Sequence, residues 1–229
     1  MSNLAIITAR GGSKRIPKKN IKDFCGKPII SYAIKAAVES GIFDDVMVST
    51  DDNEIADISR KYGVSVPFMR SAKNSDDYSG TSDVLIEVVR EFEKIGRIFT
   101  TVCCIYPTAP FVTAEKLIEA YDKFETEGAD AIIPVVQFSY PPQRCFVATG
   151  GLIKYKWPKY EKSRSQDLEP LYHDAGQFYF IKTDVLIAQK TLVPANTVPF
   201  KVDELEVQDI DNVTDWKMAE LKYKLMRGI

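Results

Sequence analysis

Short runs of apolar residues alternate along the chain with longer stretches in which apolar residues recur every three or four positions. The short runs are typical of buried strands, and the longer periodic stretches are typical of amphipathic helices. Strands are predicted over residues 4–8, 46–49, 64–68, 101–105, 131–136 and 178–181. Helices are predicted over residues 27–40, 53–62, 82–94, 113–125, 183–189 and 214–226. This alternation predicts an α/β fold with a mostly parallel sheet sandwiched by helices, whose ligands gather at the carboxyl ends of the strands.

Residues with known positional preferences define the predicted helix ends. Pro28 suits the first turn of the 27–40 helix, and Gly41 suits the position after its last residue. The buried face of this helix is expected to contain Ile30, Ile34, Ala37 and Val38. The other predicted N-terminal capping residues are Asp51 and Asp52, Thr81 or Ser82, and Thr214.

The alternation of strand and helix patterns breaks between residues 137 and 172. This stretch contains Pro141-Pro142, Gly150-Gly151 and Pro158, together with a cluster of tyrosine, tryptophan and lysine residues. Because proline and glycine pairs favour turns, hairpins and irregular structure are predicted here. No internal repeat is found along the chain. We therefore expect a single domain over residues 1–229 with an arm inserted over residues 140–170.

Composition and charge exclude several classes of protein. The 229 residues carry a net charge of −2, and 45% of them are hydrophobic and 27% charged, as in ordinary globular proteins. Proteins that coat nucleic acid usually have a strongly basic balance, so no nucleic-acid partner is expected. No apolar run approaches the ~20 residues of a membrane span, and no secretion signal is recognised. The adjacent Cys103 and Cys104 are expected to be packed thiols, which favours a cytoplasmic location.

A strongly basic loop follows the first predicted strand. Residues 10–27 contain seven basic residues and one acid, a net charge of +6. Gly11 and Gly12, at the carboxyl end of a strand, would let backbone N–H groups converge on an anion, and the neighbouring cations would neutralise a triphosphate. A solvated basic loop or a nucleic-acid patch is the alternative. The loop matches neither a Walker motif nor G-x-G-x-x-G, so another class of nucleotide site is expected.

An acidic run lies near the other end of the chain. Residues 203–215 contain six acids and no base, and within them Asp209-Ile210-Asp211 alternates. On an extended segment, residues i and i+2 face the same side, so both carboxylates can converge on one cation. Mg²⁺ is the predicted cofactor, since it takes one or two carboxylates together with phosphate oxygens and water. Taken alone, the D-x-D pattern is more commonly explained by an exposed acidic edge strand, and the basic loop elsewhere in the chain adds weight to the metal-site interpretation.

Five blocks of sequence stand in an order that is far more specific than any one of them. They are residues 9–21, Gly26-Lys27-Pro28-Ile29, Val48-Ser49-Thr50-Asp51, Pro107-Thr108-Ala109-Pro110 and Gln208-Asp209-Ile210-Asp211. Together they resemble the acylneuraminate cytidylyltransferases, also called CMP–nonulosonate synthetases, and the resemblance extends over nearly the whole chain. The resemblance implies a Rossmann-like nucleotidyltransferase fold. It also implies a homodimer in which the β-rich arm at 140–170 serves as a dimerisation clasp.

Two further stretches are similar to the pseudaminic acid branch of that family. They are Arg164-Ser165-Gln166-Asp167-Leu168 and Leu171-Tyr172-His173-Asp174-Ala175-Gly176. Tyr106 and Asp174 stand where the sialic acid branch carries other residues. The reaction implied joins CTP and a nine-carbon α-keto acid sugar, most simply pseudaminic acid, into a CMP-sugar and pyrophosphate, for glycosylation of bacterial flagellin or the cell surface. N-acetylneuraminate, legionaminate and 3-deoxy-octulosonate remain alternative sugars.

The resemblance also implies roles for individual residues. Arg10 and Lys19 would stabilise charge on the triphosphate as it reacts, and Asp211 would help to deprotonate the attacking hydroxyl. The phosphates would be held by Gly11, Gly12, Ser13 and Lys14. Cytosine and ribose would be contacted by Asn20, Arg70, Ser79 and Thr81. The sugar would be contacted by Tyr106, Arg164, Gln166, His173, Asp174 and Gln177, and Mg²⁺ by Asp209 and Asp211.

Some of these assignments have structural alternatives. Arg164 is expected to pair with the sugar carboxylate through both of its terminal nitrogens. His173 could instead be a packed or hydrogen-bonded histidine, and Arg70 a surface residue. Two other functions fit parts of the pattern: a metal-dependent glycosyltransferase, which also places D-x-D on a nucleotide-binding sheet, and a non-catalytic nucleotide- or RNA-binding module.

Overall fold

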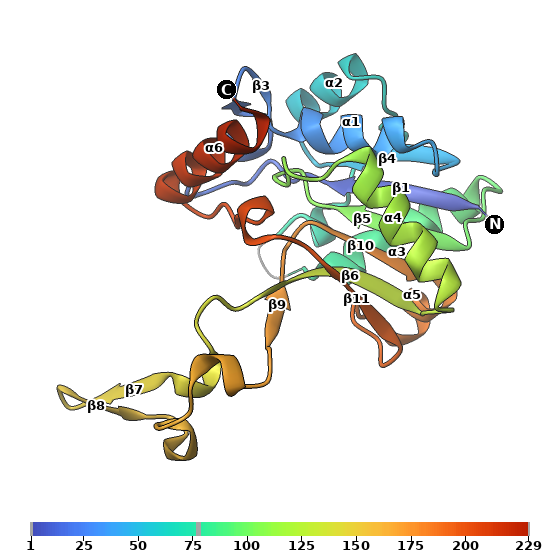
Figure 1. Cartoon of the computed structure of the whole chain (residues 1–229). Coiled ribbons are helices and arrows are strands. Elements are labelled where there is room, and N and C mark those ends of the chain that lie inside the picture. Colours follow the sequence, from blue (N-terminus) through green and yellow to red (C-terminus); the bar gives the residue numbers. More distant parts are fainter. Residues whose placement is uncertain (1, 77–78, 229) are drawn as a thin grey trace.

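A central sheet organises the other elements of the molecule (Figure 1). The computed structural model describes residues 2–76 and 79–228. In spatial order the strands are β11 (Thr197–Lys201), β6 (Ala131–Gln137), β10 (Phe178–Lys182), β5 (Thr101–Ile105), β1 (Asn3–Thr8) and β4 (Asp45–Ser49). A seventh strand, β9 (Tyr172–Asp174), pairs with the carboxyl-terminal half of β6.

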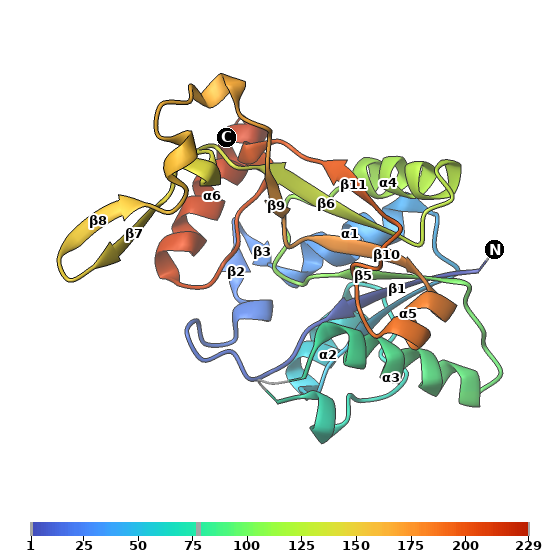
Figure 2. The ribbon, with the colours of Figure 1, turned by 90° about the horizontal axis from the view of Figure 1, so that it is seen from below.

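Helices cover both faces of this sheet (Figure 2). One face packs against α1 (Ile30–Ser40), α2 (Asn53–Lys61) and α4 (Ala114–Thr126), and the other against α3 (Thr81–Lys94) and α5 (Thr183–Gln189). Successive side chains of a strand point to opposite faces. Accordingly, Ala5 and Ile7 of β1 are buried in the first layer and Leu4 and Ile6 in the second. Burial on both faces explains why these strands appear in the sequence as continuous apolar runs.

A third apolar cluster joins the two ends of the chain. Ile16 and Phe24, which follow β1, pack with Ile210 and with Trp216 of α6 (Val213–Arg227), and all four side chains are buried. This cluster fixes the basic loop after β1 beside the acidic segment before α6. The two segments are far apart in sequence. Burial of these apolar side chains holds the segments together, although it also removes water from the charged side chains nearby, which costs free energy.

The predicted mostly parallel sheet is confirmed, with one reversal. β1 runs parallel to β4 and β5, and β11 runs parallel to β6, whereas β10 is antiparallel to both of its neighbours. The reversal arises because the chain returns along the end of β6 as β9 and enters β10 without a crossover helix. A parallel connection needs such a crossover, so this direct return imposes the antiparallel direction.

Several predicted boundaries are confirmed and others are corrected. Asp52 caps α2 by accepting hydrogen bonds from two backbone N–H groups, as expected, and Gly41 ends α1 in the left-handed region at φ 66°. Pro28, expected in the first turn of α1, instead belongs to β3 (Lys27–Pro28), which pairs with β2 (Asp23–Phe24). Val38 is 50% exposed, so it lies outside the buried face of α1.

Three further predictions about local structure are wrong. The stretch 64–68 forms only an isolated bridge between Ser65 and Met47, because it lies at the sheet edge beyond β4. The residue that caps α3 is Gly80, and the residue that caps α6 is Asn212. Asn212 accepts from the N–H groups of Thr214 and Asp215, and the Asp215 side chain accepts in return from the Asn212 N–H. This capping box satisfies more backbone donors than a Thr214 cap would.

An arm projects from the body between β6 and β9 (Figure 1). It contains the hairpin of β7 (Phe146–Thr149) and β8 (Leu152–Tyr155), with short 3₁₀ turns at Pro142–Arg144, Pro158–Tyr160 and Ser165–Asp167. Leu152 is 77% exposed and Ile153 is 68% exposed, which is unusual for large apolar side chains on neighbouring positions. Among the described residues, no helix combines the length and apolar character needed to cross a bilayer.

Candidate active site

Two adjoining cavities lie at the carboxyl ends of the central strands, where ligands of open α/β sheets bind. The first, of about 590 Å³, opens beside the end of β1 and the basic loop. The second, of about 640 Å³, lies between β9, the end of β6 and the segment 204–210. Tyr106 and Thr108, which follow β5, line both cavities. Asp211 lines the first and Asp209 the second, so the D-x-D segment also stands at their junction.

The first cavity collects most of the residues predicted to bind the nucleotide. Its lining includes Arg10, Ser13, Lys14, Lys19, Asn20, Arg70, Ser79, Thr81 and Asp211. They come from the loop after β1, the segment between α2 and α3, the start of α3 and the segment before α6. The structure therefore brings these distant positions together around one cavity at the strand ends, and their roles in binding stay predictions.

The oppositely charged segments make direct contact in this cavity. Lys19 Nζ donates to the main-chain oxygen of Ile210 at 2.7 Å, and Arg15 Nη2 lies 2.7 Å from Asp211 Oδ1. Burial lowers the pKa of Lys19, although the nearby Asp211 and Asp209 carboxylates oppose that shift. Burial also raises the pKa of Asp209, with a further contribution from the Asp211 charge. Lys19 is therefore a half-buried cation placed between the two carboxylates.

Asn20 and Arg70 are buried side chains that shape the cavity. Asn20 Nδ2 donates to the Arg10 main-chain oxygen at 2.8 Å, which ties the end of the loop to its beginning. Arg70 donates from Nε to Ser49 Oγ at 3.0 Å and from Nη2 to the Ser49 main-chain oxygen at 2.6 Å. Burial lowers the pKa of Arg70, with Asp51 opposing the shift. The alternative that Arg70 is a surface residue is wrong, because only 9% of it is exposed.

The backbone N–H groups around Gly11 and Gly12 were expected to converge on an anion, but two of the N–H groups in this loop bond to the protein instead. The Gly11 N–H donates to Asp51 Oδ1 at 2.8 Å, and the Ser13 N–H donates to the Gly11 oxygen at 2.9 Å. These two amides are therefore engaged within the protein, and neither Gly11 nor Gly12 lines the cavities found among the described residues. The charged residues of the loop that line the first cavity are Arg10, Lys14, Arg15 and Lys19.

Replacing Gly11 is expected to destabilise the fold. A Cβ at Gly11 would lie 2.8 Å from Asp52 Oδ2 and 2.9 Å from Asp52 Cβ. Because Asp52 caps α2, its movement would sacrifice that cap, which is worth about 1 kcal/mol. Gly11→Ala should therefore lower the melting temperature by roughly 2–4 °C.

Thermal unfolding followed by circular dichroism measures this effect, and Gly12→Ala is the matched control. A Cβ at Gly12 would meet no atom within 4 Å, so its melting temperature should stay at the wild-type value. Equal melting temperatures for the two variants would contradict the close approach to Asp52.

The second cavity contains part of the predicted sugar site. Tyr179 donates to Asp174 Oδ2 at 2.8 Å, and its ring centroid lies 5.3 Å from that of Tyr106. The Tyr106 hydroxyl lies 3.3 Å from Thr81 Oγ1, so a polar chain of side chains links the two cavities. Burial raises the pKa of both tyrosines, which keeps both phenols protonated and able to donate.

His173 and Gln177 occupy different layers of this site. His173 lines the cavity, and its ring centroid lies 4.8 Å from that of Phe138. Its Nδ1 lies 2.9 Å from the main-chain oxygen of Asp174. Gln177 lies behind the cavity wall, where its Nε2 donates to the main-chain oxygen of Glu206 at 2.5 Å. Its main-chain oxygen accepts from the Tyr106 N–H at 2.8 Å. Gln177 therefore positions Tyr106 and the Glu204–Glu206 turn, η6, rather than lining the cavity.

Arg164 and Gln166 lie in the arm, away from both cavities of this chain. The Arg164 guanidinium makes two hydrogen bonds to Asp167, at 2.7 and 3.1 Å. The structure thus separates these two residues from the other predicted sugar ligands. Their role in sugar binding stays a prediction that requires a second copy of the chain.

Several lining residues were not expected from the sequence. In the first cavity they are Thr8, Arg15, Asn74, Asp76 and Thr108, and in the second Ser139, Tyr179, Glu204, Gln208 and Lys222. Arg15 and Thr108 belong to sequence blocks that already indicated a site. Asn74 and Lys222 carry no local signal, because only the fold brings their segments to the strand ends.

Asp209 and Asp211 are suitable ligands for Mg²⁺. Among residues 2–76 and 79–228, no group of three or more histidine, cysteine or acidic residues could hold a metal on its own. Mg²⁺ commonly uses one or two carboxylates and completes its shell with substrate phosphates and water. The Arg15–Asp211 contact involves exposed side chains, and exposed ion pairs are worth less than about 1 kcal/mol, so a cation could replace it.

Comparisons with known proteins agree with this geometry. A family model described as Cytidylyltransferase matches residues 4–193. The chain is 42% identical to a pseudaminic acid cytidylyltransferase of Campylobacter jejuni subsp. jejuni serotype O:2, over 98% of this chain and 97% of that protein. It is 32% identical to a CMP-N,N'-diacetyllegionaminic acid synthase of Legionella pneumophila subsp. pneumophila, over 96% of this chain and 95% of that protein.

Among solved structures, a CMP:2-keto-3-deoxy-manno-octonic acid synthetase complexed with CTP matches with a TM-score of 0.72. The match covers 100% of both chains at 17% identity, which confirms the nucleotidyltransferase fold. Family membership also decides between enzyme classes, because it favours nucleotidyl transfer over the glycosyltransferase alternative. The family model spans the central strands and the basic loop, and the chain therefore belongs to the cytidylyltransferase family of nucleotidyltransferase enzymes.

Proposed function

We propose that this enzyme transfers a cytidylyl group from CTP to a nonulosonic acid and releases pyrophosphate. The observation that carries the proposal is the pair of adjoining cavities that meet at Tyr106 and at the Asp209–Asp211 segment. One cavity is lined by several cations and suits a triphosphate. The other is lined by hydroxyl, carboxylate and amide groups and suits a polyhydroxylated sugar. A transferase that joins these two substrates needs this arrangement.

Pseudaminic acid is the sugar we propose first. The 42% identity to a pseudaminic acid cytidylyltransferase exceeds the 32% identity to a legionaminic acid synthase, and both matches cover nearly the whole chain. Tyr106 and Asp174, which stand where the sialic acid branch carries other residues, both line the second cavity. Legionaminic acid and N-acetylneuraminic acid are the alternative substrates, and a role in bacterial surface or flagellin glycosylation follows from the pseudaminic acid assignment.

The mechanism we propose is an in-line displacement. The anomeric hydroxyl of the sugar, held in the second cavity, attacks the α-phosphate of CTP in the first, and pyrophosphate leaves. Such reactions depend mainly on positioning and on stabilisation of charge. Arg10, Lys14 and Lys19 would hold the triphosphate and stabilise the leaving group. Asp211, at the junction of the cavities, would accept the proton of the attacking hydroxyl.

Mg²⁺ is the cofactor we propose, held by Asp209 and Asp211. When bound, it would act with the cations of the basic loop to stabilise negative charge on the phosphates. The half-buried Lys19 donates a hydrogen bond to the main-chain oxygen of Ile210, the residue between the two aspartates. This bond holds both carboxylates close to the cavity.

We also propose that the enzyme is a homodimer joined through the arm. Large apolar side chains are exposed on the hairpin, including Phe146 at 53% and Leu152 at 77%. Exposed apolar surface of this kind marks sites of protein association. Such a dimer could bring Arg164 and Gln166 of one chain to the sugar cavity of the other. A cytoplasmic location stays a prediction from the packed, unpaired cysteines.

Pyrophosphate release tests the proposed function directly. The purified protein is incubated with CTP, Mg²⁺ and, in separate reactions, pseudaminic, legionaminic and N-acetylneuraminic acids. We expect pyrophosphate release that requires both substrates, is abolished by EDTA and is fastest with pseudaminic acid. Release with a different acid as the preferred substrate would overturn the sugar assignment. Absence of release with every acid would overturn cytidylyl transfer to nonulosonic acids.

A further inference from the structure

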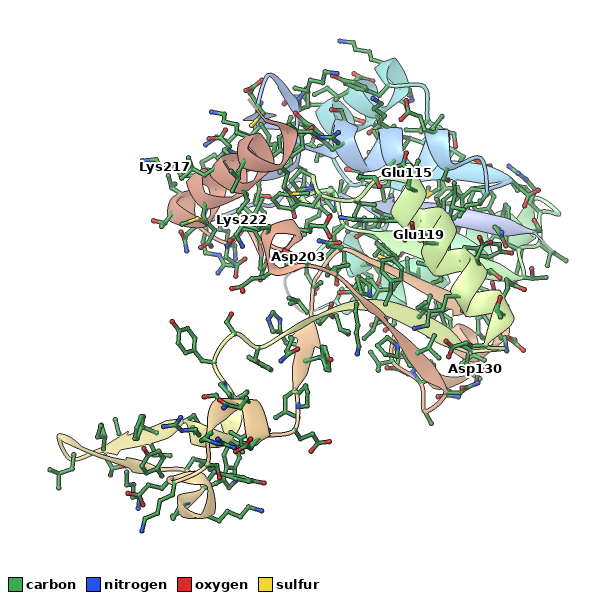
Figure 3. The ribbon with its side chains drawn as sticks, in the orientation of Figure 1. Glu115, Glu119, Asp130, Asp203, Lys217 and Lys222 are labelled. Carbon is green, nitrogen blue, oxygen red and sulfur yellow. The ribbon has the colours of Figure 1, made fainter. Side chains whose placement is uncertain are left out.

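The C-terminal helix contributes a cation to the second cavity. Lys222 of α6 lines this cavity together with Gln208 and Asp209. Figure 3 shows Lys222 on the side of α6 that faces the η6 turn, near Asp203, whereas Lys217 lies on the outer side of the helix. Lys222 Nζ donates to the main-chain oxygens of Glu204 at 3.1 Å and Val207 at 2.7 Å. The ammonium group is therefore held in place by two neutral acceptors.

The turn that holds Lys222 is itself fixed. Asp203 and Glu206 form a capping box around η6 (Glu204–Glu206). Lys116 of α4 forms an ion pair with Glu206 Oε1 at 2.8 Å, and Gln177 donates to the Glu206 oxygen. These contacts come from three different parts of the fold. The position of the Lys222 ammonium is thus set by the tertiary structure rather than by a flexible loop.

The electrostatic surroundings of Lys222 are unusual. Among the described residues that line the second cavity, Lys222 is the one lysine or arginine, and it stands among Asp174, Glu204 and Asp209. Lys222 makes its hydrogen bonds to the two main-chain carbonyls and forms no ion pair with a described carboxylate. A lysine ammonium has three N–H donors, so at least one remains after these two bonds. Among the described residues, its positive charge also has no direct counter-charge.

We propose that Lys222 binds the carboxylate of the α-keto acid substrate. This inference rests on the proposed function and assigns one substrate group to one side chain of the same site. An incoming carboxylate would be repelled by the three acids of the cavity, and Lys222 is the lysine or arginine that this chain's described residues themselves place in its lining. Arg164, for which this role was expected, is bound to Asp167 in the arm. The carboxylate would complete the hydrogen bonding of an already oriented ammonium, which lowers the entropic cost of binding.

The test compares charge with shape at position 222. Lys222→Gln keeps hydrogen-bond donors and removes the charge, and Lys222→Arg keeps the charge. We expect Lys222→Gln to raise KM for the keto acid by about 10- to 100-fold, as for loss of a charged hydrogen bond. KM for CTP should change less than about twofold, because Lys222 does not line the first cavity. Lys222→Arg should recover most of the affinity. Lys217→Gln, on the outer face of the same helix, should behave as wild type.

A second readout separates recognition of the carboxylate from a structural role. The wild-type enzyme should discriminate against the methyl ester of the keto acid, and Lys222→Gln should lose most of that discrimination. Retained discrimination in Lys222→Gln, or its loss in Arg164→Ala alone, would overturn the assignment. If Lys222→Gln unfolds, the assignment is tested with Lys222→Arg, whose ester discrimination must then persist. The wild-type reaction is measured first, so that a failure of the proposed function is recognised separately.

Discussion

Asp211→Asn is expected to lower the rate of pyrophosphate release by at least about 10²- to 10³-fold, the usual cost of removing one transition-state electrostatic contact. The substitution keeps the shape of the side chain and removes its negative charge. Asp211 lines the triphosphate cavity at its junction with the sugar cavity, and its carboxylate is one of two that could hold Mg²⁺ there. The loss should fall mainly on kcat, with saturating CTP and sugar unable to restore it.

The fold should survive this change. The Asp211 side chain is 42% exposed, whereas its neighbour Ile210 is buried in the apolar cluster that anchors the segment. Asp122→Asn, an equal change of charge on the exposed face of α4, is the control and should leave the rate unchanged. Circular dichroism checks folding, and binding of Mg²⁺ to the CTP complex is measured by calorimetry. An active Asp211→Asn enzyme with unchanged Mg²⁺ affinity would exclude both proposed roles of this carboxylate.

Lys19→Met is expected to reduce kcat/KM for CTP by at least about 10²-fold, since it removes a charged group from a partly desolvated site. Methionine fills a similar volume, so little packing is lost. Without the ammonium, Asp209 and Asp211 lose their half-buried counter-charge, and the Ile210 oxygen loses a donor at 2.7 Å. Both changes weaken the ordered junction between the cavities. The neighbouring Lys18→Met is the matched control, because Lys18 is exposed and pairs with Glu54.

The pH profile gives a second measure of the Lys19 role. Burial lowers the pKa of Lys19, and a cation on the triphosphate is lost as the pH rises through that pKa. Wild-type kcat/KM should therefore fall at high pH, earlier than an ordinary lysine would require. Lys19→Met should lack this alkaline limb while keeping the rest of the profile. A profile identical to wild type would mean that another group controls the limb.

The elements that were predicted correctly depend on short-range rules. The run from Leu4 to Ile7 could be recognised as a strand because both faces of β1 are buried, and Asp52 and Gly41 stand at helix ends for reasons confined to a few residues. Pro28 shows the limit of those rules. Its preference for a first helical turn was outweighed by pairing with Asp23 in a two-stranded ribbon.

Some residues of the candidate site were predicted from the sequence, whereas others were misplaced or missed. Arg10, Lys19 and Asp211 lie within compact sequence blocks whose chemistry can be recognised from the sequence alone. All three residues line the first cavity. Arg164 also lies in such a block, yet the arm carries it away from the cavities of its own chain. Lys222 gave no signal at all, because its chemistry comes from the carbonyls of Glu204 and Val207 and from the acids around it.

The sequence by itself determined the long helices and most of the central strands, the segregation of charge into a basic loop and an acidic run, and the residue types at hand for phosphate and Mg²⁺. These follow from local periodicity, capping and charge, which require no knowledge of distant contacts. Only the tertiary structure decided that the two charged segments meet, since burial of Ile16, Ile210 and Trp216 in one cluster brings them together. It also decided the reversal of β10 and the place of Lys222, because both depend on how the chain returns to the sheet rather than on any neighbouring residue.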